Sequence, residues 1–193
     1  MKKAFFLFAG VILVLGISGS AFAEGSGNGT EDSHNININI ETFALLAIES
    51  TRTSEITLAP KKPTEAGFGY DFKNAKDQSL WLNYSSVVAK DETRTITVAA
   101  TKSNLPEGLY LQVEAKEANT TNGKGELGEA VSEAVTLSET AKEIVNEIGS
   151  CYTGNGHKNG RNLIYSLNMD NDKYKNLFAD DKYQVTVTYT ITE

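Results

Sequence analysis

The segment that most constrains the fold is Tyr183–Ile191, near the C-terminus, where apolar and polar side chains alternate strictly. Its apolar positions are Tyr183, Val185, Val187, Tyr189 and Ile191. A period of two places all of these side chains on one face of a β-strand. They are also β-branched or aromatic, which suits a pleated and half-buried surface. The segment therefore predicts a β-strand that covers a core with one face.

Similar patterns recur along the chain and predict most of the remaining structure. Alternating segments lie at residues 79–88, 94–100, 109–115 and 163–169, and less regular apolar stretches lie at 55–58 and 130–137. The apolar run at 43–48 fits a strand or a short helical turn, because periodicity alone does not separate the two. Short strands at this spacing, separated by turn residues, predict an all-β, Ig-like antiparallel β-sandwich.

One segment has a helical pattern instead. Its apolar residues are spaced i, i+3, i+4, i+7, which gives an apolar stripe on a helix. They are Ala141, Ile144, Val145 and Ile148. Ser138 is a suitable N-cap and Gly149 a suitable residue to end the helix. We therefore expect one short helix over residues 138–149, packed on the sandwich.

The N-terminus has the features of an export signal. Lys2 and Lys3 precede an apolar run from Ala4 to Ile17, and the small residues of Ala21-Phe22-Ala23 follow. This order predicts a signal peptide over residues 1–23, with an uncleaved N-terminal anchor as the alternative. A Gly/Ser/Asn-rich leader at 24–33 and a single domain at 34–193 are expected to follow. The protein is thus expected in the periplasm, at the cell surface or in the medium, with no membrane span after cleavage.

The charge of the chain disfavours nucleic-acid binding, and its cysteine content excludes an intramolecular disulfide. The net charge is −7, and removal of Lys2 and Lys3 makes it −7 − 2 = −9. This acidic balance disfavours nucleic acid as a partner, because phosphates require a basic surface. A single cysteine, Cys151, cannot form an intramolecular disulfide. It is expected to be either a half-buried apolar residue or a free thiol able to bridge two molecules.

Two motifs have the residue types of a cofactor or metal site but not the context. Gly123–Gly128 matches G-x-G-x-x-G, but it lies in a polar stretch of an all-β pattern, so a flexible loop is expected. Asp170 and Asp172 offer oxygen ligands for calcium, yet the glycine turn and distal glutamate of a calcium loop are missing. A solvated turn is therefore expected at Asp170–Asp181, with a helical turn around Tyr174 to Phe178.

The remaining polar residues do not form a recognisable catalytic group. His34, His157 and Cys151 are too few and too distant to predict a structural zinc site. Cys151 and His157 share one loop, 151–162, but a third catalytic group and an oxyanion donor are not evident. The sequence thus predicts no catalytic, cofactor or metal site, and we expect the protein not to be an enzyme.

Three aromatic residues are candidates for stacking on a ligand. Trp81, Tyr110 and Tyr152 fall outside the expected core positions or in a loop. They suggest a secreted carbohydrate- or ligand-binding module as an alternative function. The competing interpretation is that Trp81 packs on the second face of its strand.

The chain also resembles a group of bacterial surface proteins. Its Gly/Ser/Asn leader, the alternating Asn35–Ile40 segment and the ending Lys182–Ile191 are similar to those of chaperone–usher pilins, spore-coat-U-type pilins and WxL-type cell-surface domains. The paired cysteines of many pilins are absent, and Trp81-Leu82 does not match the W-x-L motif.

The resemblance implies a structural role and a mode of assembly. It implies an exported, non-enzymatic structural or adhesive surface protein of pilus-subunit type, which joins copies of itself or other subunits by β-strand addition. The added strand would carry Ile36, Ile38 and Ile40 into three successive pockets. Alternatively, this strand pairs within its own domain. We expect the second arrangement, because no linker separates the strand from the apolar run that follows.

Overall fold

The computed structural model describes residues 30, 33–51, 55–179 and 183–192. The chain divides into two units, Met1–Ile38 and Asn39–Glu193. The expected signal peptide lies outside the described residues, as does all of the expected leader except residues 30 and 33. All of the described strands belong to the second unit.

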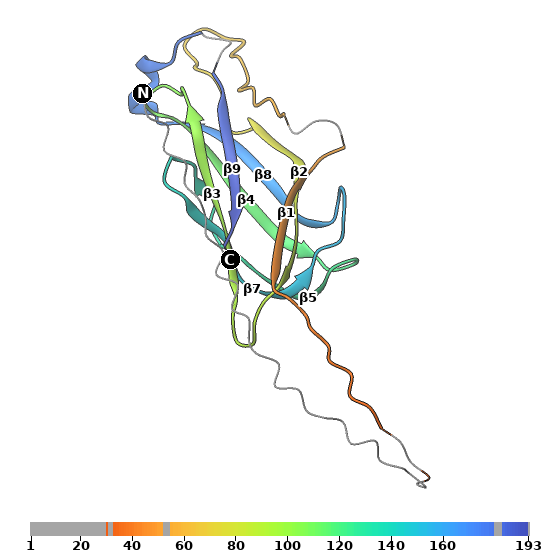
Figure 1. The fold of residues 1–193 in the computed structure, drawn as a ribbon. Helices are drawn as coiled ribbons and strands as arrows, with labels where there is room; N and C mark the ends of the chain where they lie inside the picture. The colour runs from red at the N-terminus through yellow and green to blue at the C-terminus, as the bar shows by residue number, and fades with distance from the viewer. Residues whose placement is uncertain (1–29, 31–32, 52–54, 180–182, 193) are drawn as a thin grey trace, which may run out of the picture. The chain divides into compact units, whose positions relative to one another are not determined.

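The described part of this unit consists of nine strands and one short 3-10 helix (Figure 1). The strands are β1 (Phe43–Glu49), β2 (Lys76–Val87), β3 (Arg94–Ser103), β4 (Leu109–Asn119), β5 (Lys124–Ala130), β6 (Val135–Thr136), β7 (Lys142–Tyr152), β8 (Gly160–Met169) and β9 (Val185–Ile191). The helix is η1 (Asn171–Asn176), which confirms the helical turn expected near Tyr174.

The pairings between these strands are antiparallel, in the order β6-β4-β8-β2-β7-β3-β9, with β1 added to β2 and β5 added to β7. The pairing between β2 and β7 involves only Ser85 with Tyr152 and Ser86 with Cys151. This short junction joins β1, β2, β8, β4 and β6 to a second group of β5, β7, β3 and β9. The expected all-β antiparallel fold is confirmed, and the Ig-like sandwich remains a prediction.

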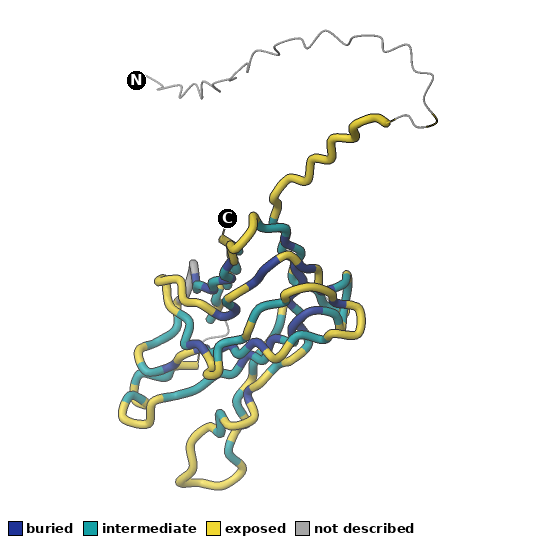
Figure 2. Tube along the Cα trace, turned by 90° about the horizontal axis from the view of Figure 1, so that it is seen from below, coloured by how far each residue is buried: buried dark blue, intermediate teal, exposed yellow. Residues whose placement is uncertain are grey.

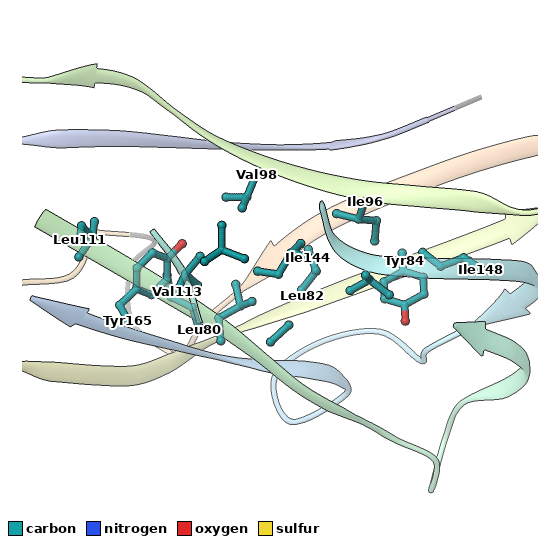
Figure 3. Close-up of a cluster of buried hydrophobic side chains, with 14 of the residues drawn as sticks. Leu80, Leu82, Tyr84, Ile96, Val98, Leu111, Val113, Ile144, Ile148 and Tyr165 are labelled. Atoms are coloured by element: carbon teal, nitrogen blue, oxygen red, sulfur yellow. The ribbon is translucent and has the colours of Figure 1, made fainter. Parts of the chain in front are cut away.

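The hydrophobic core draws side chains from both groups of strands (Figure 3). On β2, Leu80, Leu82 and Tyr84 are buried, and Ile144 and Ile148 of β7 belong to the same cluster. Buried and more exposed positions alternate along the strands (Figure 2). This alternation follows from the pleat, because successive side chains point to opposite faces.

The helix expected over residues 138–149 does not form, and the prediction is wrong. The segment is instead strand β7, which pairs with β3 on one side and β5 on the other. Its register shifts against both neighbours, and Glu147 has a positive φ of 54°. Such bulges turn the chain locally, so that Ile144, Val145 and Ile148 are all buried. A bulged strand thus produces a spacing that resembles a helical stripe.

The Gly123–Gly128 segment is not a loop but most of strand β5. Gly125 and Gly128 both have a positive φ, and they lie close to the backbone of β7. A Cβ atom on Gly125 would collide with the carbonyl oxygen of Ser150, and one on Gly128 with that of Asn146. These glycines are therefore explained by close strand pairing, and the expected flexible loop is wrong.

Three other expected strands differ from the structure. Residues 55–58 have no regular structure, and the stretch at 130–137 contains only the last residue of β5, Ala130, and the two-residue strand β6. Asn35–Ile40 also has no regular structure, so the strand expected there is not formed, and its pairing with its own domain or with a neighbour stays a prediction. The apolar run at 43–48, for which the pattern left two interpretations, is strand β1.

Candidate functional sites

The candidate donor residues Ile36, Ile38 and Ile40 are all strongly exposed. The exposed fractions of these residues are 74%, 82% and 77%. A single exposed isoleucine needs no explanation, but three at alternate positions form one apolar row as soon as the segment becomes extended. The chain as described thus leaves this row uncovered.

Strand β1, which follows directly in the sequence, has apolar residues on both faces. Ala44, Leu46 and Ile48 are half-buried, and Leu46 and Ile48 pack against the core. Phe43 and Leu45 point the other way and are 45% and 65% exposed. Among the named strands β1 pairs only with β2. Exposed apolar residues therefore continue along the sequence beyond the isoleucine row as far as Leu45.

Strand β9 covers the core only partly. Its inward residues, Val185, Val187, Tyr189 and Ile191, are all half-buried. On the neighbouring β3, in contrast, Ile96, Val98 and Ala100 have exposed fractions of at most 2%. The Tyr189 hydroxyl lies 2.7 Å from that of Tyr165 on β8. Burial raises the pKa of Tyr165 to about 12, so this hydrogen bond joins two neutral phenols at neutral pH.

The three aromatic candidates do not form one site. Trp81 is half-buried, and its ring packs edge-on against that of His157 at a centroid distance of 5.9 Å. Tyr110 and Tyr152 are 37% and 50% exposed, on β4 and β7. On β8, Trp81 pairs with Asn162 and Tyr110 pairs with Asn168. These two positions lie about 20 Å apart along the strand. The structure therefore separates these residues.

Two shallow, open surface hollows are present on the described part of the molecule, and neither is lined by these three aromatics. One, of about 440 Å³, is acidic. It is lined by Thr93, Glu126, Gly128, Glu129 and Glu147. The other, of about 320 Å³, contains aromatic residues and no charged one. It is lined by Gly69, Tyr70, Phe72, Asn171 and Tyr174.

Cys151 and His157 lie on opposite sides of the sheet. Cys151 is buried in the core beside Ser86 of β2. His157 packs on Trp81, whose odd position places it on the other face of the same strand. Burial raises the pKa of the Cys151 thiol to about 11, although the nearby Arg161 opposes this rise. The thiol is thus protonated at neutral pH, and this geometry does not support a nucleophile–base pair.

The acidic residues before η1 have a structural role. The Asp170 carboxylate caps the helix by accepting a hydrogen bond from the backbone N–H of Asp172 at 3.3 Å. Within the described ranges, no group of three or more histidine, cysteine or acidic side chains is arranged to hold a metal ion. In the same part of the chain, no helix has the length and apolar character required to cross a membrane.

The largest buried polar side chain of the domain, Arg161, was not indicated by any sequence pattern. This residue lies at the start of β8 and is fully buried. Its guanidinium donates to the Tyr84 hydroxyl at 2.9 Å and to three backbone carbonyls, those of Lys116, Leu127 and Gly128, at 2.6–3.2 Å. Tyr84 in turn donates to Leu127 at 2.6 Å. Because its partners come from β2, β4 and β5, Arg161 ties three strands together.

Among the described residues, the acidic partner of Arg161 is peripheral. The Glu117 carboxylate is 3.7 Å away and its side chain is 86% exposed. Such an exposed ion pair contributes little to stability. The buried charge of Arg161 is therefore compensated mainly by the carbonyl dipoles. The adjacent Gly160 has a φ of +69°, and a Cβ there would collide with the carbonyl oxygen of Leu82. Gly160 therefore allows β8 to begin directly against β2.

Comparison of this chain with protein-family models, with curated proteins and with solved structures gave no match.

Proposed function

We propose that this chain is an exported, non-enzymatic structural or adhesive surface protein whose copies associate by β-strand addition. The observation that carries the proposal is the exposed, alternating row of Ile36, Ile38 and Ile40. In this mode residues 35–40 of one copy extend and pair with an edge strand of the next. Main-chain hydrogen bonds then supply affinity, and the isoleucines enter pockets on one face.

The energetics favour covering this row. Complete burial of one isoleucine contributes about 1.5–3 kcal/mol, so three together offset much of the entropy lost when the segment is ordered. Six residues is also a typical strand length. A row of large apolar side chains that the described chain leaves uncovered is therefore suited to a partner surface.

The candidate acceptors are the strands β9 and β1. Each of them pairs with a single named strand, β3 and β2 respectively. The inward side chains of β9, including Val187 and Tyr189, remain half-buried at this margin of the core. An added strand would complete their burial. The signal-like residues 1–23 support export of the chain, so that assembly takes place at the cell surface, in the periplasm or in the medium.

The test is the size of the exported protein in solution. Light scattering after size-exclusion chromatography should show oligomers whose mass rises with protein concentration. Replacement of Ile36, Ile38 and Ile40 together by Asn should yield a folded monomer, because the polar row no longer gains by burial.

A matched control changes the polar face of the same segment. Asn35→Ser, Asn37→Ser and Asn39→Ser together should leave the oligomers unchanged, since only the isoleucine face enters the partner. A wild-type protein that stays monomeric at all concentrations would contradict the proposal. Equal loss of oligomers in both triple variants would argue against side-chain pockets.

The alternative, ligand binding through Trp81, Tyr110 and Tyr152, has less support. These residues lie on separate strands, and Trp81 is half-buried in a T-shaped contact with His157. They line neither surface hollow.

A further inference from the structure

The aromatic hollow at the η1 end of the domain contains the elements of a small-molecule site. It lies between the loop before β2 and the helix η1. Tyr70 and Tyr174 are 41% and 38% exposed, whereas Phe72 is half-buried. The volume of about 320 Å³ falls at the lower end of the range for ligand pockets, about 300–1,000 Å³.

The Tyr174 ring is held in place before any ligand binds. The Tyr174 hydroxyl accepts a hydrogen bond from the backbone N–H of Tyr70 at 3.0 Å. The Tyr174 ring lies against Gly69, where a Cβ would come within 3.1 Å of it. Lys61 and Asp71 exchange two backbone hydrogen bonds, of 2.8 and 2.9 Å, which close the base of the loop. A preformed site of this kind loses little entropy on binding.

The polar groups in the hollow are neutral. Asn171 is exposed, and within the described residues no hydrogen bond engages its side chain. Its amide offers both donors and an acceptor, and the tyrosine hydroxyls offer one donor each. The other hollow, with Glu126, Glu129 and Glu147, differs because it has three carboxylates and no aromatic ring.

We propose that the aromatic hollow binds a neutral sugar unit of a polysaccharide. A pyranose ring presents an apolar C–H face, which packs on the faces of Tyr70 and Tyr174, and hydroxyl groups at its rim, which pair with the Asn171 amide. The absence of charged residues among the lining residues of this hollow selects against acidic sugars, whose carboxylates would find no cation there.

This site is independent of the proposed strand addition. None of its residues belongs to the 35–40 segment, β1 or β9. The triple Ile36, Ile38 and Ile40 to Asn variant should therefore keep its sugar affinity. Failure of one proposal leaves the other intact.

The test is calorimetric titration of the exported protein with three neutral hexasaccharides, of β-1,4-glucose, β-1,4-N-acetylglucosamine and α-1,4-glucose. At least one should bind with a Kd of about 1 mM or lower. Tyr70→Ala should weaken that binding about tenfold, through loss of a stacking face. Asn171→Ala should weaken it several-fold.

Two variants separate binding from folding. Tyr174→Phe retains the ring but loses the hydroxyl that accepts from the Tyr70 N–H, so it should bind more weakly than the wild type and more tightly than Tyr174→Ala. Tyr152→Ala, which removes an aromatic of similar exposure on β7, should have no effect. The proposal is overturned if none of the three sugars binds, if Tyr70→Ala binds like the wild type, or if a hexagalacturonate binds more tightly than the neutral sugars.

Discussion

Around Arg161 the strands are held together by a buried hydrogen-bond network, whereas along β9 the core is covered by apolar side chains that remain half-exposed. Arg161, Tyr84 and Cys151 are all buried at the first region. At the second, Val187 and Ile191 contact the same core but are each only partly covered.

This difference shows how the two regions can serve different purposes. A buried guanidinium is costly unless all of its groups are paired, so its network fixes one arrangement of β2, β4, β5 and β8. A half-exposed apolar strand keeps the fold and still gains free energy when another chain covers it. We therefore expect rigidity at the Arg161 end and partner binding at the β9 margin.

Among substitutions that test this comparison, Arg161→Met is expected to have the largest effect on stability. The variant removes the guanidinium that donates to the Tyr84 hydroxyl and to three carbonyls, of which only that of Leu127 still accepts from Tyr84. We expect a loss of about 3–5 kcal/mol in the free energy of unfolding, measured by urea denaturation of the monomeric triple Ile-to-Asn variant. Glu117→Gln is the control and should change stability little, because Glu117 is exposed. Equal effects of the two changes would show that the ion pair matters most.

A second test compares the same residue type on two adjacent strands. Val98 of β3 is 1% exposed, and Val187 of β9 is half-buried. Val98→Ala should cost about 2–3 kcal/mol through lost burial and a cavity, and Val187→Ala about 1 kcal/mol. Thermal or urea unfolding measures both. Equal costs would mean that the β9 margin is as well packed as the centre of the core.

A third test uses pH at the Arg161 end. Burial raises the pKa of Cys151 to about 11 in the folded protein, from 9.0 for an ordinary thiol. Between these values the unfolded state binds fewer protons, so the stabilising contribution is complete below pH 9 and is lost as pH rises through 11. The free energy of unfolding should fall by about 2–3 kcal/mol over this range. Cys151→Ala should flatten the stability curve between pH 9 and 11, and an unchanged slope would show that the thiol does not titrate there.

The smallest expected effect concerns the tie between Tyr165 and Tyr189. Tyr165→Phe removes one hydroxyl of a 2.7 Å hydrogen bond and should cost about 1 kcal/mol. Tyr110→Phe, at an exposed site on β4, should be neutral by the same unfolding measurement. If both changes were neutral, the hydrogen bond would not stabilise the β9 margin.

The strands could be predicted where one face is buried and the other meets solvent. The segments at 94–100, 109–115 and 163–169 fall within β3, β4 and β8. At β7 the pattern was misleading, because Ile144, Val145 and Ile148 are buried around a bulge and imitate a helical stripe. The site residues were predicted less well. Trp81 is half-buried and contacts His157, and the aromatic hollow combines two segments distant in sequence.

The sequence by itself determined the all-β class, because side-chain alternation is a local property of an extended backbone and is visible in segments such as Val185–Ile191. Only the tertiary structure decided the burial of Arg161 and the strand conformation of β7. Each of these features depends on residues far along the chain. Arg161, for example, donates hydrogen bonds to Tyr84 and Leu127. Local patterns do not encode which distant strand supplies a hydrogen bond or leaves an apolar row uncovered.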